Sequence, residues 1–548
     1  MNFFNNIKTI ALSLLVSCTA ISCNDMLDLK PQGQFGADQM TDDAIEGLMS
    51  AAYAGLEGHF FGNNEAFTAP ATNWVFDVRS DDAYKGGGGV SMESSIHQLE
   101  ISNLTSDNPT NLNKWRNNYY AIARVHQAMR AIKDANSIDN KDALLGELSL
   151  LRAYFYFDLI RIFERIPYLN ENSVPNTVRY DEFTRDEIFE KIKKDLNNAW
   201  LNMTETQAQA GRFNKYVAAA LMTQVSAYTS SWSDVVEYAD YVIGSGKYSL
   251  YDNYLDMSKI EFNNSKESIM AIQFSTANNN AHINWGNLLN TTYSEGNLFG
   301  SGDDFFLASQ NLVNAFRTDA NGLPYLDNFN DKNVTINYDG NVDPRLDFTV
   351  GRIGLPFRGY TYNQKWCRAY DVYGEYSNKK TMIDPNSAEM VQGFPWGASA
   401  LNFCLIRYAD ILLLKAEALI EQNTDLKTPR NIINDVRAKA NRSINGAYTP
   451  VDLNPMIANY KVSAYPETGW NQEYARKAVR MERRIELAME GKRWFDLVRW
   501  GEVVEVVNKY MQSENKLRPY YTGASISADE IYLAIPYEEV TNSGGLYE

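Results

Sequence analysis

The sequence predicts a mainly α-helical protein in which tetratricopeptide-like helical hairpins form a scaffold for a loop-rich, mixed α/β portion. Amphipathic helical periodicity dominates residues 44–243 and returns at residues 407–510. Between these stretches, residues 248–403 are rich in Asn, Gly, Asp and aromatic side chains and largely lose that periodicity. A chain of 548 residues can bury a large core and normally divides into two or three folding units.

The N-terminus predicts export. Lys8 is the only charged side chain before the apolar run at residues 10–16, and small residues with two cysteines follow. The run is too short to span a bilayer and is typical of a secretory signal peptide. A cysteine directly after a small residue indicates lipid attachment, either at Cys18, which has Leu15 three residues before it, or at Cys23, which precedes an acidic segment. A plain signal peptide with incidental cysteines is the alternative.

Helical hairpins follow. The run at residues 184–200 begins with a capping box made of Thr184 and Glu187. The pair at 215–228 and 233–243 resembles a tetratricopeptide unit, although the Trp-Leu-Gly-Tyr signature of that repeat is absent. Helices are predicted at residues 44–56, 114–133, 141–163, 184–200, 215–228 and 233–243.

Irregular structure is predicted for residues 248–403, with short strands at 268–274 and 346–350. Long irregular segments inside a compact protein usually carry function, so we expect a ligand-binding region here; a decorative insertion is the alternative. The only cysteines beyond the N-terminus, Cys367 and Cys404, could form a disulfide or remain as buried thiols.

Helix returns near the C-terminus. The run at residues 407–421 is apolar on nearly all sides, which predicts burial. A second helix is predicted at 428–440, with Pro429 in the favoured first turn, and a third at 473–510, broken at Gly491.

Charged residues spaced three apart follow that break. Arg493, Asp496 and Arg499 could be mistaken for a catalytic group, but neighbours at this spacing on a helix form ion pairs. We predict that they brace the scaffold, and that Arg407 and Asp410 tie helix ends together.

Several segments together resemble one family. They are RYADILLLKAEALIE (407–421), IINDVRAKA (432–440), ERRIELAMEGKRWFDLVRWGE (482–502), LAIPYEEV (533–540) and, at the N-terminus, SCNDMLDLKP (22–31). With these segments the chain resembles the SusD-like (RagB/SusD) family of Bacteroidetes outer-membrane nutrient-binding lipoproteins, across essentially the whole mature sequence. In that family the lipidated cysteine shortly precedes an acidic, Leu-containing segment, and for this reason we predict lipidation at Cys23 rather than Cys18.

The resemblance implies a function and a division into regions. Members of the family bind glycans, or in some cases peptides, at the cell surface and hand them to a SusC-like TonB-dependent transporter, over which the lipoprotein closes like a lid. The resemblance therefore implies that this protein is anchored by lipid to the outer membrane. It gives no catalytic residue that could be carried over to this sequence. The expected division is a signal peptide at 1–22, an N-terminal helical region at 23–247 with a binding loop at 74–90, a loop-rich ligand-binding region at 248–403, and a C-terminal RagB/SusD helical region at 404–548.

Composition and motifs favour binding over catalysis. The formal net charge of −17 argues against nucleic-acid binding, which needs a basic surface. The four histidines show no HExxH motif, and neither a Walker loop nor a Gly-x-Ser-x-Gly elbow occurs. Residues 339–343 imitate the start of a calcium loop, but Pro344 and Val350 stand where Gly and Glu are needed. We expect no enzyme activity, cofactor or metal; the enzyme alternative is a surface glycosidase, since suitable carboxylate pairs must exist among 68 acidic residues.

Sugars present apolar C–H faces and polar edges, so aromatic platforms flanked by Asp, Asn and Arg suit them. Three stretches combine these residue types, at 74–84, 278–299 and 358–376. We predict that the first two form one exposed site, with Trp285 as its main stacking surface. In a peptide-binding version of the same scaffold, the aromatic pockets would hold side chains. The predicted ligand contacts are Trp74, Asp81, Asp82, Tyr84, Trp285, Asn287 and Tyr293.

Overall fold

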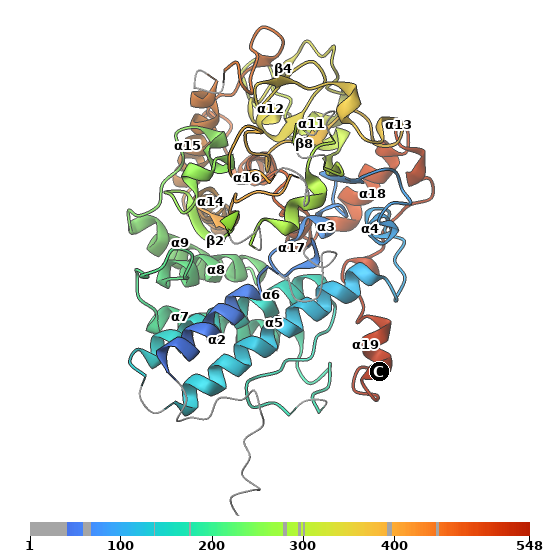
Figure 1. Ribbon diagram of the computed structural model, residues 1–548. Coiled ribbons are helices and arrows are strands. Elements are labelled where there is room, and N and C mark those ends of the chain that lie inside the picture. The colour runs from blue at the N-terminus through green and yellow to red at the C-terminus, as the bar shows by residue number, and fades with distance from the viewer. Residues whose placement is uncertain are drawn as a thin grey trace, which may run out of the picture.

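The structure is a computed structural model, and helices dominate it (Figure 1). The strands among the described residues are only two to five residues long, so the predicted mainly α fold is confirmed. Both cysteines considered for lipidation, Cys18 and Cys23, lie outside the described residues. The structure describes residues 41–57, 67–135, 138–174, 177–277, 282–293, 298–299, 302–391, 397–444 and 449–548.

Helices of the N-terminal half pack in sequence order and form the lower part of the molecule in Figure 1. Each of them packs against the next, and the first covers α5. This arrangement is the predicted scaffold of helical hairpins. The helices are α2 (Asp42–Ala54), α5 (Pro109–Asp134), α6 (Lys141–Ile162), α7 (Arg185–Asn202), α8 (Lys215–Tyr228) and α9 (Trp232–Gly244).

Side-chain caps determine where several of these helices begin. The capping box at the start of α7 is confirmed, because Thr184 Oγ1 accepts from Glu187 N while Glu187 Oε2 accepts from Thr184 N. Helix α5 begins five residues earlier than its predicted start at 114, since Asn108 caps it and Pro109 occupies its first turn.

The loop-rich portion lies above the scaffold in Figure 1 and contains only short elements. The strand predicted at residues 346–350 is a correction, because the structure has the helix α12 (Arg345–Thr349) there and only Val350 belongs to a strand. All five residues of this helix are buried, so the alternation of apolar residues did not distinguish a strand from a helix. The other helices and 3-10 turns of this portion are η3 (Tyr254–Ser258), η4 (Ile260–Phe262), η5 (Trp285–Asn290), α11 (Gln310–Ala315), η7 (Phe329–Asp331), η8 (Gln364–Trp366) and α13 (Tyr370–Tyr373). Two short helices, α3 (Trp74–Asp77) and α4 (Ser94–Glu100), come earlier in the chain, between α2 and α5.

Strands pair only in twos among the described residues. Two pairs join distant parts of the chain, since β1 lies antiparallel to β3 and β2 lies antiparallel to β9. The β2–β9 pair connects the end of the hairpin scaffold to the C-terminal helices. The strands are β1 (Ala83–Gly86), β2 (Ser268–Ile272), β3 (Phe305–Ala308), β4 (Asn341–Val342), β5 (Val350–Gly351), β6 (Pro356–Phe357), β7 (Tyr360–Thr361), β8 (Ser377–Asn378), β9 (Phe403–Arg407) and β10 (Asn459–Tyr460).

The C-terminal helices return to pack on the scaffold, with α14 against α8 and α9. The predicted break at Gly491 is confirmed, and a second break follows at Gly501; both glycines have φ of +71°. No helix in the described part of the chain is long and apolar enough to cross a membrane. The elements are α14 (Tyr408–Gln422), α15 (Lys427–Ser443), α16 (Gln472–Glu486), α17 (Arg493–Trp500), α18 (Val503–Glu514), η9 (Pro519–Tyr521), η10 (Ala528–Glu530) and α19 (Tyr537–Asn542).

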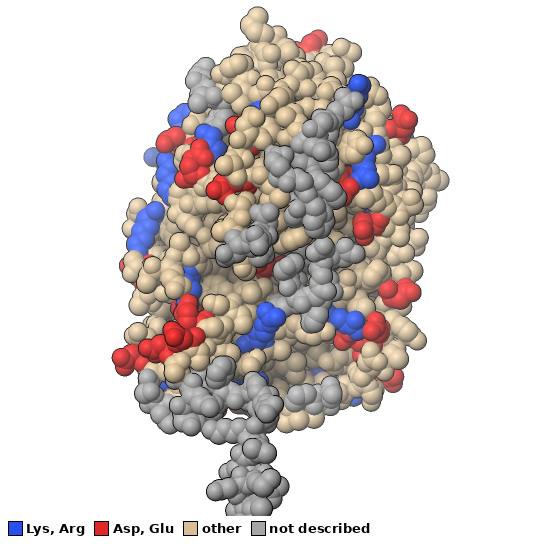
Figure 2. Space-filling view, viewed as in Figure 1, with Lys and Arg blue, Asp and Glu red and all other residues tan. Residues whose placement is uncertain are grey.

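A buried ion-pair network joins these helices to the loop-rich portion. Arg407 contacts Glu267 at 2.8 Å and Glu486 at 2.7 Å, and Arg345 contacts Glu482 and Glu486 at 2.7 and 2.9 Å. Because removing one partner of a buried pair leaves an uncompensated charge, this network fixes how the helices meet. On the face shown in Figure 2, by contrast, charged side chains of both signs are interspersed.

The predicted bracing roles are also confirmed. Asp410 pairs with Arg483 at 2.9 Å, and Asp496 pairs with Arg499 at 2.8 Å. Cys367 and Cys404 are free thiols, so the disulfide alternative is wrong.

Candidate functional site

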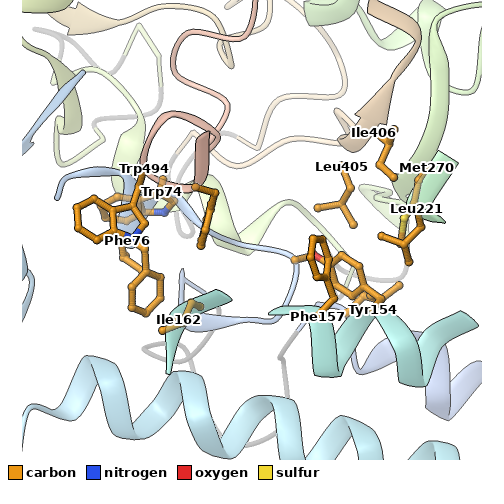
Figure 3. Packing of buried hydrophobic residues seen from close by; sticks show 14 of the residues in the cluster. Trp74, Phe76, Tyr154, Phe157, Ile162, Leu221, Met270, Leu405, Ile406 and Trp494 are labelled. Atoms are coloured by element: carbon orange, nitrogen blue, oxygen red, sulfur yellow. The ribbon is translucent and has the colours of Figure 1, made fainter. Parts of the chain in front are cut away.

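Trp74 belongs to the core. Its side chain is 5% exposed, and its ring lies 6.2 Å from the ring of Phe305 and 5.7 Å from that of Phe306. Figure 3 shows it among other buried apolar side chains, close to Trp494. The prediction that Trp74 contacts the ligand in an exposed site is therefore wrong, because α3 buries the ring against β3.

The two predicted loops nevertheless meet. The indole Nε1 of Trp74 donates a hydrogen bond of 3.0 Å to the carbonyl oxygen of Gly286. The loop that contains Trp74 is thus in direct contact with the loop that contains Trp285.

Asp81 and Asp82 also have structural roles. Both are buried: Asp81 accepts from Arg493 at 2.8 and 3.1 Å, and Arg484 lies 3.0 Å from Asp81 and 2.7 Å from Asp82. Burial by itself raises the pKa of Asp81, but Arg484 and Arg493 outweigh it and lower that pKa to about 2. Their assignment as ligand contacts is corrected, because both carboxylates are already bound to arginines that the sequence places about 400 positions away.

The assignment of Tyr84 as a ligand contact is also corrected. Strand β1 pairs with β3 and buries the Tyr84 side chain completely. Its hydroxyl donates to Glu514 at 2.6 Å and accepts from Gln310 N at 2.9 Å. Because its side chain is completely buried and its hydroxyl is bonded inside the core, Tyr84 cannot contact a ligand.

Trp285 and Asn287 lie in η5, at the edge of a narrow pocket. Trp285 is half-buried against Ile283 and lines this pocket together with Trp74, Phe306 and Phe403. The cavity volume is about 30 Å³, enough for a water-sized group but too small for a sugar ring. Trp285 is thus neither a core residue nor the fully exposed platform that was predicted.

The most exposed predicted contact is Tyr293, which is 42% exposed. The guanidinium of Arg368 lies 5.5 Å from the centre of its ring, within the range of a cation–π contact. Arg368 also forms an ion pair with Asp303, and its backbone N–H donates to Asp304 Oδ2 at 3.1 Å. We call Tyr293, Asp303 and Arg368 the tyrosine–arginine surface.

A glycine-rich loop borders this surface. Gly86, Gly87 and Gly89 all have positive φ, and a Cβ atom added to Gly88 would lie 3.4 Å from Arg368 Nε. Gly87 N donates to the carbonyl oxygen of Asp304 at 2.8 Å, which fixes the loop beside the surface.

Lys85 holds the same loop from inside. Its ammonium donates to the carbonyl oxygens of Gly89, at 2.8 Å, and Met92. Burial lowers the pKa of Lys85 to about 8, although Glu100 and Glu93 oppose this shift. The loop therefore has a fixed shape, which reduces the entropy lost when a ligand binds beside it.

The third predicted stretch contributes Arg368 to the tyrosine–arginine surface, and it also contains Tyr360. Tyr360 is 36% exposed on the β6–β7 hairpin, and its ring lies 6.4 Å from that of Phe299. Beneath it, the buried rings of Phe357 and Trp366 form a rigid base. Arg368 is not among the predicted ligand contacts, although its position among aromatic residues in an irregular segment was a signal for it.

The surface offers an aromatic face, a guanidinium and a carboxylate close together, a combination that contacts both the apolar and the polar parts of a ligand. Among the described residues, no group of three or more His, Cys, Asp or Glu side chains could hold a metal ion. The apparent calcium loop is also otherwise occupied, because Asp343 binds Arg345 at 2.8 Å.

Fold and surface together define a class of protein: a scaffold of helical hairpins on which loops build a polar and aromatic surface. The model of the SusD family matches residues 266–548, more than half of the chain, and a model described as starch-binding associating with outer membrane matches residues 69–226. The chain therefore belongs to the SusD family, as the sequence motifs predicted.

Individual relatives agree with this assignment. A SusD-like protein of Formosa agariphila is 24% identical over 528 residues, covering 92% of this chain and 94% of that protein. A SusD superfamily protein from Bacteroides vulgatus has a similar structure, with a TM-score of 0.70 and 20% identity over 92% of this chain and 98% of that one. Surface glycan-binding protein A from Bacteroides thetaiotaomicron, solved in complex with laminarihexaose, gives a TM-score of 0.68 and 18% identity over 92% of this chain and 99% of that one.

Proposed function

We propose that this protein is a lipid-anchored protein of the outer-membrane surface that binds a glycan and delivers it to a SusC-like TonB-dependent transporter. Membership of the SusD family supports the proposal, as does a structural neighbour that holds laminarihexaose. A family model described as associating with the outer membrane supports the location.

The observation that carries the proposal is the tyrosine–arginine surface. An exposed aromatic ring can stack on the C–H face of a sugar, while Arg368 and Asp303 can bind hydroxyl groups at its edge. Three separate loops build this surface and Lys85 fixes one of them, so the surface is formed before a ligand arrives.

Delivery requires two bound partners, so the test measures both. The mature chain should bind at least one oligosaccharide on a glycan panel with measurable affinity and should bind no member of a peptide library. A tagged full-length protein should also co-purify with a TonB-dependent transporter from outer membranes solubilised in mild detergent. Peptide binding without glycan binding would contradict the glycan assignment, and purification without a transporter would contradict the delivery role.

A further inference from the structure

A buried carboxyl group, that of Asp304, lies next to Asp303 of the tyrosine–arginine surface. Asp304 is only 2% exposed, and it comes directly before strand β3. Its φ is +58°, in the left-handed region that most side chains avoid and that Asp and Asn tolerate best. A buried carboxyl group in this conformation needs partners that hold it there, and the segments that build the surface supply them.

Hydrogen bonds of Asp304 join all three segments of this surface. Its backbone N–H donates to the carbonyl oxygen of Thr291, two residues before Tyr293, at 2.9 Å. Its own carbonyl oxygen accepts from Gly87 N at 2.8 Å, and its Oδ2 accepts from Arg368 N at 3.1 Å. One residue therefore fixes the segment of the exposed ring, the glycine-rich loop and the segment of the guanidinium relative to one another.

A chain of hydroxyl groups leads away from the other carboxylate oxygen. Ser377 Oγ donates to Asp304 Oδ1 at 2.6 Å and lies 2.5 Å from the hydroxyl of Tyr362, which lies 3.3 Å from Cys367 Sγ. Each of these groups can both donate and accept a hydrogen bond. The chain can therefore donate toward an ionised Asp304 or, with its hydrogens reversed, accept from a protonated one, so both states are compatible with the fold.

The surroundings allow this carboxyl group to change its charge near neutral pH. Burial raises the pKa of Asp304 to about 7, although the hydrogen bonds from Ser377 and Arg368 and the charge of Arg368 oppose this shift. Tyr362 and Cys367 stay neutral at this pH, because burial raises the pKa of both. The other titratable side chains of the adjoining segments are Lys85, Tyr293, Asp303 and Glu375.

Of these, Lys85 and Asp303 carry charges that bear on the surface. Asp303 pairs with the guanidinium of Arg368. Burial lowers the pKa of Lys85 to about 8, so this ammonium, which holds the glycine-rich loop, stays mostly charged below about pH 7.5. Between about pH 6 and pH 7.5 the main change of charge is therefore at Asp304.

We propose that Asp304 is a positioning residue whose ionised carboxylate sets the affinity of the tyrosine–arginine surface for its ligand, so that the affinity rises with pH near neutrality. This inference rests on the proposed glycan-binding function and adds to it a regulation of the same site. Hydrogen bonds to an ionised carboxylate are roughly twice as strong as those to a neutral acid, so the ionised form holds the Arg368 segment more firmly. Protonation loosens that segment and increases the entropy lost when a ligand orders it.

Calorimetric titration of the oligosaccharide that binds best on the glycan panel, from pH 6 to pH 7.5, tests the inference. With a pKa of about 7, about one-tenth of Asp304 is ionised at pH 6 and about three-quarters at pH 7.5. If only the ionised form bound, the affinity would be about eightfold lower at pH 6, and we expect a decrease of at least about threefold.

Two variants distinguish positioning by charge from a merely structural contact. Asp304→Asn tolerates the same backbone conformation but carries no charge, so it should bind at every pH as weakly as the protonated parent. Ser377→Ala removes a hydrogen bond that lowers the pKa of Asp304, so the midpoint of the binding profile should move to higher pH. The control is Asp77→Asn, which removes another buried carboxyl group of raised pKa, bonded to Trp494 N at 2.9 Å, and should keep the parent profile.

The outcomes separate this inference from the proposed function. Equal affinity of the parent at pH 6 and pH 7.5, or an Asp304→Asn variant that keeps the pH dependence of the parent, would contradict the role of Asp304 and leave the glycan-binding function standing. An unmoved midpoint in Ser377→Ala would also overturn that role, and this result is decisive even where Asp304→Asn fails to fold. If no oligosaccharide of the panel binds at either pH, both proposals are contradicted.

Discussion

Replacing Asp81 by Ala tests whether this carboxylate supports the fold, as its contacts indicate, or contacts ligand. Arg493 would lose a two-point contact of 2.8 and 3.1 Å, and Arg484 would lose one of 3.0 Å. Removing one partner of a buried ion pair costs about 3–5 kcal/mol, because the remaining charge stays buried. Because Arg484 keeps its contact with Asp82 at 2.7 Å, we expect the lower end of that range, about 3 kcal/mol. Most of this cost comes from Arg493, which lies 4.0 Å from Asp82.

The assay is urea unfolding followed by tryptophan fluorescence, combined with calorimetric titration of an oligosaccharide into the folded protein. Asp81→Ala should lower the urea midpoint and leave the Kd of the folded protein unchanged. The control is Asp181→Ala, which removes an exposed ion pair with Arg179 and should barely move the midpoint. An unchanged midpoint together with lost binding would refute the structural role.

The lowered pKa of Asp81 also predicts how the stability of the protein depends on pH. The pKa of Asp81 is lowered to about 2 in the folded protein, against about 3.9 for an unfolded aspartate. The stabilisation from a depressed carboxylate is fully present above the unfolded pKa and is lost as the pH falls through the folded one. The difference in stability between the parent and Asp81→Ala should therefore shrink as the pH falls from about 4 to about 2.

Three further changes test other parts of the account. Trp74→Ala should lower the free energy of unfolding by about 3–5 kcal/mol in urea titrations, because the ring is buried. Unchanged stability together with lost glycan binding would show instead that Trp74 contacts the ligand. Burial raises the pKa of Asp77 to about 8, so the folded protein keeps a proton that the unfolded chain releases, and stability falls as the pH rises from about 4 to about 8. Asp77→Asn should reduce this slope in urea titrations across that range, with the remainder due to Asp304 and Glu514, whose pKa values burial raises to about 7; equal slopes in parent and variant would show an ionised Asp77. Cys23→Ala should release the protein from the membrane, with acyl chains found on Cys23 of the parent by mass spectrometry; acyl chains on Cys18 would contradict this choice.

Local patterns made most of the helical fold predictable. Helix α8 has the predicted bounds, and α7 begins with the predicted capping box, because periodicity and caps depend on residues within a few positions of one another. The short elements of the loop-rich portion were harder. Helix α12 is buried all round, and the short alternation of apolar residues in its sequence matches a strand as well as a helix.

The ligand contacts depended on partners far away in the sequence. Asp81 and Tyr84 stand in a polar, aromatic stretch that suits a binding loop, but their partners Arg493 and Glu514 come from the C-terminal helices. Tyr293 was predicted because it belongs to the stretch at residues 278–299, which combines aromatic and polar side chains. Arg368 was not, since only the folded chain places it over Tyr293.

The most direct test of the glycan-binding claim is the affinity of Tyr293→Ala for the oligosaccharide that binds best on the glycan panel. By analogy with bases stacked on aromatic side chains, loss of the ring should cost about 1–3 kcal/mol, which corresponds to at least tenfold weaker binding at the middle of that range. The Tm should stay nearly constant, because the ring is 42% exposed, and Tyr537→Ala, at a tyrosine of α19 that is 59% exposed, should change neither quantity. Unchanged affinity in Tyr293→Ala would contradict the proposal that the tyrosine–arginine surface binds the glycan.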